Sequence, residues 1–558
     1  MSLFTRLSDL ELVSVLDSFD VLSLVALSQT CKRLYLAAHD VMSRSPSMVQ
    51  DVVQLTPGSL RNLASHLQSP PTIAIIWSAF GTNGFAQARP AFKDMLRREL
   101  PSAIAMVMAD NAYVQNNSTY ESKRKKESKT LPLKAVVMLG AFPEAKSHSA
   151  LFRKQMVVKH LKLEEHKDEG KEEDEIVSID TLMQSEGFDP AVDWRFFMVS
   201  VHEYDDWSTT FVKRLQARYP KASIIGGICT TGLACASSSE KGFTTTLDGE
   251  FQGSLSLLGM AGNCPVQTIV SRGVEPVSDT YNITDASWSE EDNNAMPAGE
   301  VMRVAQCQHA ARANSSGTCP EEGVYDVLVA ASRRAHSSFG LLMGLRIPVP
   351  TATLAIAGAA ASEGFVLVQV TREHIIPSED GVHKLSLILE DGGDVLPTQI
   401  RFFTITAKSC ARDVVTQMNT AKASFKQRNE RVMGAIMFSC SARGPNKSEM
   451  LPTEMYDSSC FKKTFGDDVP LIGRYENGEI GPQAMASDEG SHIFRSGNVA
   501  VQGFTAVFGI FALPSNKAES QLKALLSATP ALGLSAEQLV GRIVSDVLLK
   551  KRSQHSRP

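Results

Sequence analysis

The sequence predicts a mixed α/β protein with a short helical module at its N-terminus. From residue 72 onward, short apolar runs are separated by polar segments with helical spacing, an alternation that is typical of α/β domains. Residues 7–38 differ, because they contain three short amphipathic segments with helical spacing. At 558 residues the chain is too long for one hydrophobic core, so we expect three or four structural units.

Composition narrows the class of protein. Hydrophobic residues make up 43% of the chain and charged residues 21%, which is typical of a globular protein. The net charge of −5 provides no positive excess, so we expect neither nucleic acid nor an anionic membrane as a partner. The longest weakly polar stretch, Thr351–Val370, carries Ser362 and Glu363, so we predict no membrane span. The first twenty residues lack the apolar core of a secretory signal, which predicts an intracellular protein.

The cysteines indicate reduced thiols. Nine cysteines are an odd number, and no CxxC pair occurs, which argues against a disulfide framework and against a zinc ribbon. Cys307, His309 and Cys319 are close in sequence, but their spacing fits no common zinc pattern and a fourth ligand is missing. We therefore expect no metal and no cofactor.

The N-terminal module begins with a recognisable helix start. Ser8 and Glu11 form a capping box, in which each side chain satisfies a backbone amide of the first turn. Asp20 caps a second helix, and a third begins near Thr30. Helices this short are marginal in isolation, and their apolar side chains exceed what three small helices can bury among themselves. We therefore expect a partner protein to complete the module.

Residues 1–45 are predicted to be an F-box, because the run Leu7–Ala38 resembles that family. The resemblance is carried by the spaced leucines and by the triplet Cys31-Lys32-Arg33. Ser8 stands where the family usually has proline, and Tyr35 stands where tryptophan is common. The resemblance implies binding to the Skp adaptor of a cullin-based ubiquitin ligase through Leu7, Leu10, Leu16, Leu24, Leu27 and Leu34. The alternative is an N-terminal three-helix cap on a larger domain.

Residues 46–71 contain several prolines and are predicted to be a linker. An α/β domain is expected over residues 72–285, interrupted by two charged, solvated insertions at 116–130 and 162–178. Its amphipathic helices are expected near Phe92–Leu100 and Trp207–Tyr219. Its strands are expected at Ile73–Trp77, Ala103–Met108, Ala135–Leu139, Phe196–Val201 and Ile224–Ile225.

A second α/β body is expected over residues 300–515, followed by a tail at 516–558. In the tail, Ser535 and Gln538 form a capping box for a terminal helix. Within the body we expect a helix at Cys410–Thr420. The strands are expected at Gly364–Val370, Leu385–Leu389, Gln399–Thr406, Val432–Cys440, Leu471–Arg474 and Phe504–Phe511.

The second body resembles the C-terminal FIST domain. The resemblance is carried by DGGDVLPTQIRFFTITAKSCARDVV, GAIMFSCSARG and VPLIGRYENGEIGPQ, and GNCPVQTIVSRGVEPVSD resembles part of the N-terminal FIST domain. FIST domains are intracellular sensory modules that are proposed to bind small ligands. Joined to an F-box, they are taken to recognise proteins for ubiquitination. The resemblance therefore implies a receptor subunit with no catalytic residues of its own.

Two short segments are candidates for a ligand or cargo site. Cys440, Arg443 and Gly444 follow an apolar strand, and ligands of open α/β sheets bind beyond the ends of such strands. The second segment contains Asn477, Gly478, Glu479 and Gly481, whose glycines allow a tight turn near a bound group. We expect the two segments to meet.

Arg443 and Cys440 offer two chemical roles. Arg443 is able to hold a carboxylate bidentately, and a cation beside Cys440 would favour its thiolate. The alternative is a structural salt bridge beside a buried strand-end cysteine.

The leading functional hypothesis is the substrate-recognition subunit of a Skp-cullin-F-box ligase, which binds target proteins for ubiquitination and proteasomal degradation. The alternatives are a small-ligand sensor in signal transduction and, third, a cysteine-dependent enzyme. The sequence contains none of the GxSxG, HExxH, GxGxxG or Gly-Lys-Ser/Thr motifs, so we expect a non-catalytic protein. We expect it in the cytoplasm, and the basic run Lys123–Lys126 is a candidate nuclear address.

Overall fold

The computed structural model describes residues between 46 and 514. The described ranges are 46–67, 69–78, 94–101, 103–109, 114–116, 133–161, 179–202, 206–229, 233–239, 242–245, 254–262, 264–289, 300–310, 321–335, 340–346, 364–369, 375–376, 384–389, 397–444, 450–453, 455–487 and 492–514. The F-box-like segment 1–45, the insertions at 116–130 (apart from residue 116) and 162–178, and the tail 516–558 lie outside them. The predictions for those segments stay predictions.

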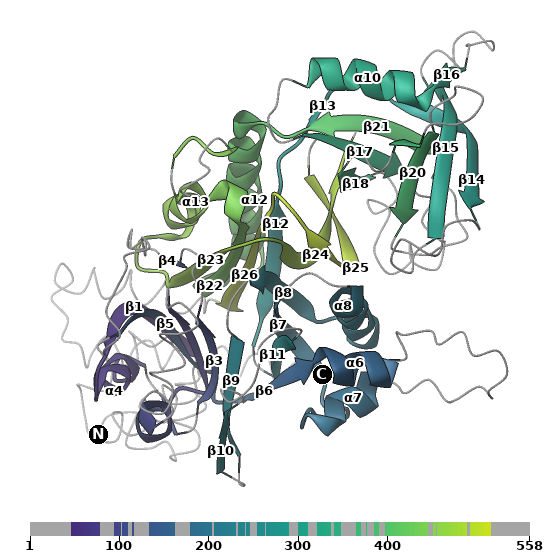
Figure 1. Cartoon of the computed structure of the whole chain (residues 1–558). Helices are drawn as coiled ribbons and strands as arrows, with labels where there is room; N and C mark the ends of the chain where they lie inside the picture. Colours follow the sequence, from purple (N-terminus) through teal and green to yellow (C-terminus); the bar gives the residue numbers. More distant parts are fainter. Residues whose placement is uncertain are drawn as a thin grey trace, which may run out of the picture.

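The described strands form three sheets of six, fifteen and five strands (Figure 1). The six-stranded sheet has the order β1-β5-β2-β3-β9-β10, in which β2 and β3 are parallel and all other neighbours are antiparallel. Its strands are β1 (Ser47–Leu55), β2 (Ile73–Ser78), β3 (Ile104–Ala109), β5 (Leu133–Ala141), β9 (Leu233–Ser239) and β10 (Gly242–Thr245).

The linker predicted over residues 46–71 is wrong. Strand β1 pairs with β5 along its whole length, and helix α4 (Ser59–Ala64) packs Leu60 and Leu63 into the core of the six-stranded sheet. The Glu99 carboxylate accepts hydrogen bonds from the backbone amides of Gly58 (2.6 Å) and Leu60 (3.0 Å), so it caps this helix. The prolines and glycine that suggested a linker therefore mark a turn and the start of a helix that packs against the six-stranded sheet.

The fifteen-stranded sheet follows the path β19-β20-β15-β14-β21-β17-β18-β24-β8-β7-β11-β6, with β13, β16 and β25 paired beside it. In Figure 1 it runs from β6, near α6 and α7, to β14 and β15 at the opposite end of the molecule. Its strands are β6 (Ala145–Arg153), β7 (Trp194–His202), β8 (Ser223–Cys229), β11 (Ser254–Gly262), β13 (Glu275–Pro276), β14 (Tyr281–Ser289), β15 (Glu300–His309), β16 (Glu322–Gly323), β17 (Leu341–Arg346), β18 (Phe365–Gln369), β19 (Ile375–Ile376), β20 (Lys384–Leu389), β21 (Gln399–Thr404), β24 (Glu479–Ala486) and β25 (His492–Gln502).

Helices cover both ends of this large sheet. The helices α6 (Lys154–Leu161), α7 (Ile179–Ser185) and α8 (Asp206–Arg218) pack against one face of β6, β7 and β11 through a large apolar cluster. At the other end, α10 (Val324–Arg334) buries Val324, Val327 and Leu328 against β15, β17 and β21 (Figure 1). Both ends therefore have their own apolar core.

The five-stranded sheet has the order β12-β26-β22-β23-β4 and joins the other two sheets. Strand β22 shows why: Ile436 and Phe438 face a core shared by all three sheets, whereas Ala435 and Met437 face α12 and α13. A strand buried on both faces has a continuous apolar sequence, as β22 does. The elements are β4 (Val114–Asn116), β12 (Val266–Ser271), β22 (Glu430–Cys440), β23 (Leu471–Glu476), β26 (Ala506–Pro514), α12 (Ala407–Gln427) and α13 (Tyr456–Phe465).

The mixed α/β class is confirmed, and described strands lie at every predicted strand position. The predicted division into bodies at 72–285 and 300–515 does not separate the sheets, however. Strand β8 pairs with β24, and β12 pairs with β26, so strands from both halves of the chain lie together in two of the sheets. In the part of the chain that the structure describes, no helix has the length and apolar character needed to cross a membrane.

Candidate functional site

The two candidate segments meet at one edge of the five-stranded sheet. Strands β22 and β23 are parallel, with Cys440 opposite Glu476, so both chains leave the sheet at the same edge. A 3-10 turn, Ser441–Arg443, follows β22. The Ser441 hydroxyl donates a hydrogen bond to Asn477 Oδ1 at 3.2 Å, which ties the two turns together. The predicted meeting of these segments is confirmed.

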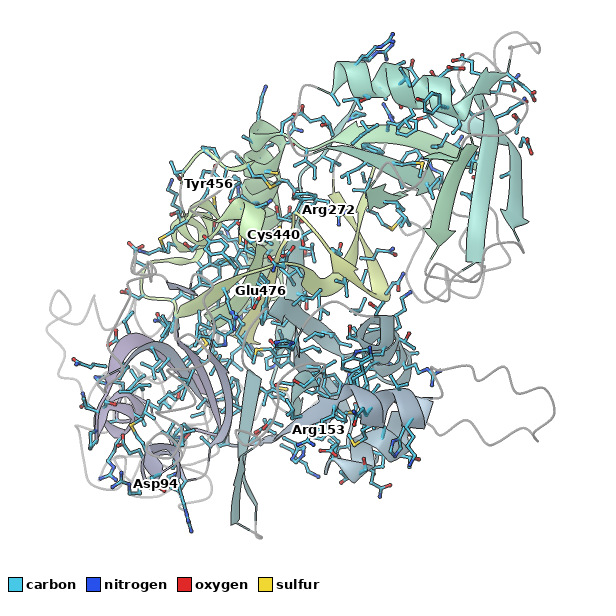
Figure 2. All side chains as sticks on the ribbon, viewed as in Figure 1. Asp94, Arg153, Arg272, Cys440, Tyr456 and Glu476 are labelled. Carbon is cyan, nitrogen blue, oxygen red and sulfur yellow. The ribbon has the colours of Figure 1, made fainter. Side chains whose placement is uncertain are left out.

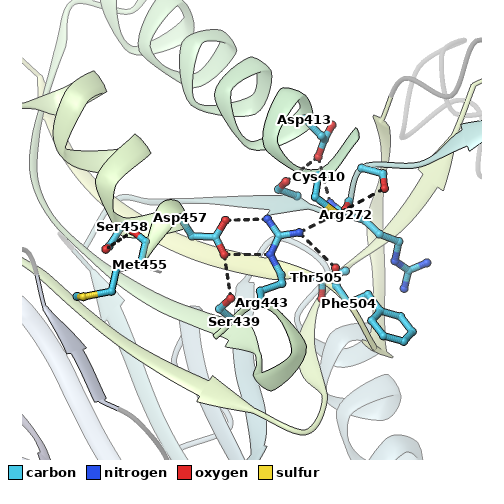
Figure 3. Close-up of polar contacts among 12 residues, drawn as sticks. Arg272, Cys410, Asp413, Ser439, Arg443, Met455, Asp457, Ser458, Phe504 and Thr505 are labelled. Atoms are coloured by element: carbon cyan, nitrogen blue, oxygen red, sulfur yellow. Dashed lines mark hydrogen bonds and ion pairs between the residues drawn. The ribbon is translucent and has the colours of Figure 1, made fainter. Parts of the chain in front are cut away.

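Arg443 is engaged inside the fold. Its Nε and Nη2 donate to the two carboxylate oxygens of Asp457 at 2.9 and 2.7 Å, and its Nη1 donates to the carbonyl oxygens of Arg272 (3.3 Å) and Phe504 (3.4 Å) (Figure 3). Ser439 donates to the same carboxylate at 3.0 Å.

This network removes Arg443 as a ligand-binding group. Burial lowers the pKa of the guanidinium, but the charge and hydrogen bonds of Asp457 outweigh burial and raise it overall. The expectation that Arg443 holds a ligand carboxylate is therefore corrected, because Asp457 already occupies its planar fork. Arg443 instead forms a structural salt bridge with Asp457, which was the alternative that the sequence left open.

Cys440 is a protonated, buried thiol. Burial raises its pKa to about 12, and the charge of Glu479 acts in the same direction, while the backbone amides of Ala442 and Phe504 and the charge of Arg443 oppose this only partly. Arg443 does favour the thiolate, as expected, but burial outweighs this effect, so the expected rise in the reactivity of Cys440 is corrected. Burial also raises the pKa of the other described free thiols, to about 11 or 12, at Cys264, Cys307, Cys410 and Cys460.

Glu479 is fully buried and only half satisfied. Its Oε2 accepts hydrogen bonds from the Thr505 amide (3.1 Å) and hydroxyl (2.7 Å). Its Oε1 has no hydrogen-bond partner in the part of the chain that the structure describes. Burial raises the pKa of this carboxyl well above its usual range, although the bonds from Thr505 oppose the rise. The side chain is thus a buried carboxyl group whose Oε1 lacks a hydrogen-bond partner among the described residues.

The glycines of the candidate segments serve packing. A Cβ on Gly444 would lie 3.1 Å from the Tyr475 ring, one on Gly478 would lie 2.8 Å from Ile228, and one on Gly481 would lie 2.8 Å from Val507. The expectation that Gly478 and Gly481 bring the backbone close to a bound group stays a prediction. Asn477 is exposed beside them.

Arg272, which the sequence reasoning did not select, completes the site. It follows β12 directly, and its carbonyl oxygen accepts from Arg443 Nη1 (3.3 Å) and from Cys410 Sγ (3.1 Å). The residue is 6% exposed, and its Nε has no hydrogen-bond partner within the described ranges. Burial lowers its pKa to about 10, while the nearby charge of Glu479 opposes this. Figure 2 places Arg272 and Cys440 together in the centre of the molecule.

A sequence signal for Arg272 did exist. It lies in the quoted segment GNCPVQTIVSRGVEPVSD, where an arginine and a glycine end an apolar run. Gly273 has a φ of +75°, and its position lies against the backbone of Cys410, which requires a residue without a side chain. Asp457 and Thr505 carry no comparable local signal, because their roles depend on contacts across the sheet.

The comparisons with known proteins identify one segment. Residues 394–482 match the FIST C domain family. The matched stretch contains Arg443, Asp457 and Glu479, whereas Arg272 and Thr505 lie outside it. The predicted resemblance to a C-terminal FIST domain is confirmed over those residues. No curated protein matches the chain.

Proposed function

We propose that the chain is the substrate-recognition subunit of a Skp-cullin-F-box ubiquitin ligase. The observation that carries the proposal is the leucine pattern of Leu7–Ala38 with its Cys31-Lys32-Arg33 triplet, placed ahead of a body with a FIST C domain match. The body holds a target protein close to the ubiquitin-conjugating enzyme, so the chain contributes proximity and the partner enzymes perform the chemistry.

The state of the candidate site argues against chemistry at Cys440. Cys440 is buried and protonated, and Arg443 is occupied by Asp457, so neither supplies an activated nucleophile or a free cation. A cysteine-dependent enzyme is the less supported alternative for this reason.

Association with the Skp adaptor uses the leucines of the N-terminal module. A stable protein interface buries about 1,600 Å² and derives most of its energy from a few anchoring side chains near its centre. Leu10, Leu16 and Leu24 are the proposed anchors, because they lie on the apolar faces of the expected short helices.

Co-purification tests this proposal. Tagged full-length protein is expected to capture a Skp adaptor and a cullin, and deletion of residues 1–45 or the double change Leu16→Ala with Leu24→Ala is expected to remove both. Val415→Ala is the matched control, since Val415 is an apolar side chain that is 40% exposed on α12. Equal recovery with and without the N-terminal segment would refute the proposal.

A small-ligand sensor is the second candidate function. It is favoured by the two buried, incompletely paired side chains of Arg272 and Glu479. Thermal unfolding of the full-length chain, measured in the presence of small metabolites, tests this role independently of Skp capture. A saturable rise in Tm is expected, and no rise with any compound would refute the sensor.

A further inference from the structure

Two adjoining cavities lie at the edge of the fifteen-stranded sheet where β7 and β8 begin. These strands are parallel, and Phe196 of β7 lies opposite Ser223, the first residue of β8, so both strands start at the same edge. One cavity has a volume of about 340 Å³ and the other about 260 Å³, and Lys221 lines both of them. Their lining residues include none of the residues of the candidate site described above.

The larger cavity has mostly apolar walls. They are formed by the loop before β7 and by the loop between α8 and β8, which supply Pro190, Ala191, Val192, Tyr219 and Pro220. Proline has a fixed φ, so each of these loops contains a conformationally restricted residue. An apolar side chain of a ligand is the group that such walls accommodate best.

Arg218 holds the two loops of the larger cavity together. Its Nε donates to both carboxylate oxygens of Asp180, at 2.6 and 2.9 Å, and its Nη2 donates to the carbonyl oxygen of Pro190 at 3.2 Å. The guanidinium also lies 5.0 Å from the centre of the Tyr219 ring. The cavity is therefore formed before any ligand arrives, which reduces the entropy cost of binding.

The smaller cavity is positively charged. Arg195 and Lys221 line it, and no acidic residue lines it in the part of the chain that the structure describes. Lys221 is exposed and forms no ion pair with any described residue. Arg195 pairs with Asp193, but their side chains are 41% and 66% exposed, and an ion pair in that setting contributes little. A carboxylate of a ligand is therefore able to replace Asp193 on Arg195.

The openness of the two cavities indicates the kind of partner. Both are open to solvent, and Pro220 and Pro265 at their walls are exposed. Small metabolites are usually enclosed by their sites, whereas peptides bind along open surfaces with single side chains in pockets. The cavities therefore suit a segment of another protein.

We propose that the two cavities bind a peptide segment of a target protein, with a carboxylate on Arg195 and Lys221 and a neighbouring apolar side chain in the larger cavity. A carboxylate matches the planar guanidinium, and the lysine adds a second positive charge. Because Lys221 lines both cavities, the two groups of the ligand belong to the same residue or to adjacent ones. The carboxylate is supplied by a chain end or by an acidic side chain. The proposal rests on the proposed receptor function and specifies what the receptor recognises.

Fluorescence anisotropy with the full-length protein tests this assignment with four rhodamine-labelled peptides. The first ends in leucine with a free carboxylate, the second is its C-terminal amide, and the third ends in glycine with a free carboxylate. The fourth is amidated and contains an internal aspartate followed by leucine. The first is expected to bind saturably, and the second and third more weakly by about tenfold. Equal binding of the first three peptides, or no binding of any, would overturn the ligand class.

The fourth peptide distinguishes the two sources of the carboxylate. Binding as tight as that of the first peptide would support recognition of acidic side chains within a target. Binding of the first peptide alone would support recognition of the chain end.

Three variants and one control locate the site. Lys221→Gln is expected to weaken binding of the first peptide by about fivefold or more, because a charge-assisted hydrogen bond is lost. Asp193→Asn is expected to strengthen it, because Arg195 loses its competing partner. Ala191→Gln places a larger side chain in the apolar cavity and is expected to reduce the preference for leucine over glycine. All three positions are exposed, and Lys408→Gln is the control, since this exposed lysine lies in the first turn of α12.

The outcomes separate this proposal from the ligase function. Peptide binding that is unchanged in both Lys221→Gln and Asp193→Asn would refute the site. Capture of the Skp adaptor without binding of any peptide would keep the receptor and refute these cavities. Peptide binding that responds to both changes, in a chain that captures no Skp adaptor, would keep the cavities and refute the ligase function.

Discussion

Arg443 and Asp457 form a bidentate ion pair in which the two side chains expose 0% and 1% of their surface. Asp457→Ala leaves the guanidinium buried and uncompensated, so we expect the free energy of unfolding to fall by about 3–5 kcal/mol. Urea unfolding followed by circular dichroism measures this loss.

Asp467 supplies the matched control for that experiment. Its pair with Lys462 spans 3.5 Å, and its side chain is 83% exposed, so Asp467→Ala is expected to change stability by less than about 1 kcal/mol. Similar losses in the free energy of unfolding for Asp457→Ala and Asp467→Ala would show that the buried pair contributes no more to stability than the exposed pair.

The buried Glu479 predicts a characteristic pH dependence of stability. Its pKa is raised in the folded chain, whereas in the unfolded chain it returns to about 4.5. Between those values the folded state holds one more proton, so the free energy of unfolding falls as pH rises, by at most about 1.4 kcal/mol per unit. Burial is the main cause of the raised pKa and the charge of Glu476 adds to it, while the hydrogen bonds from Thr505 and the charge of Arg443 oppose it.

Glu479→Gln removes this proton and isolates its contribution. The difference in unfolding free energy between the wild type and the variant is expected to shrink and then change sign as pH rises from 5 upward, and urea unfolding at several pH values measures it. Parallel curves would contradict the raised pKa.

The described cysteines are expected to be inert in the folded protein. Burial raises the pKa of each thiol, and Cys440 is 7% exposed, so a thiol reagent reaches it only when the chain opens. Peptide-resolved mass spectrometry after brief iodoacetamide treatment is expected to show little modification at Cys264, Cys307, Cys410, Cys440 and Cys460, and full modification in urea. Rapid native labelling of Cys440 would restore the reactive-thiol hypothesis.

Gly226 is expected to tolerate no side chain. It lies in β8 opposite Val199 of β7, and a Cβ there would meet the Val199 carbonyl oxygen at 1.9 Å. Because the obstacle is backbone in the centre of a sheet, Gly226→Ala is expected to cost about 3 kcal/mol or to prevent folding. Gly503→Ala is the control, since no atom lies within 4 Å of that Cβ position. Tm measurements compare the two variants, and equal values would contradict the close contact.

Local patterns were sufficient to predict most described elements. The run that forms β22 is continuously apolar because both of its faces are buried, and the helical spacing after Cys410 identified α12. The actual start of α12 is the capping box of Thr406 and Ser409, a few residues before the predicted start. The meeting of the turns that contain Ser441 and Asn477 was also predictable, because the parallel strands β22 and β23 end at one edge of the sheet.

Pairings between distant residues were not predictable in this way. No feature of the sequence near Arg443 indicates that Asp457 is its partner. Thr505 lies next to Glu479 because β26, which follows Thr505, pairs with β22. The reactivity of Cys440 was misjudged for the same reason, since its burial arises from packing of several elements. Strand β1 was missed for a different reason. Its residues are mostly only half-buried, so its apolar pattern is weak, and the neighbouring prolines and glycine indicated a linker.

Pairing between strands that are far apart in the sequence has a consequence for folding during synthesis. Strand β12 ends at Ser271, but its partner β26 begins only at Ala506. Strand β8 likewise pairs with β24, which is synthesised much later. A chain still on the ribosome therefore carries open sheet edges until almost the whole described body has emerged, and long-range pairing of this kind is slow. Nascent chains of this protein should depend on chaperones, and truncation before residue 506 should yield aggregates instead of a smaller folded domain.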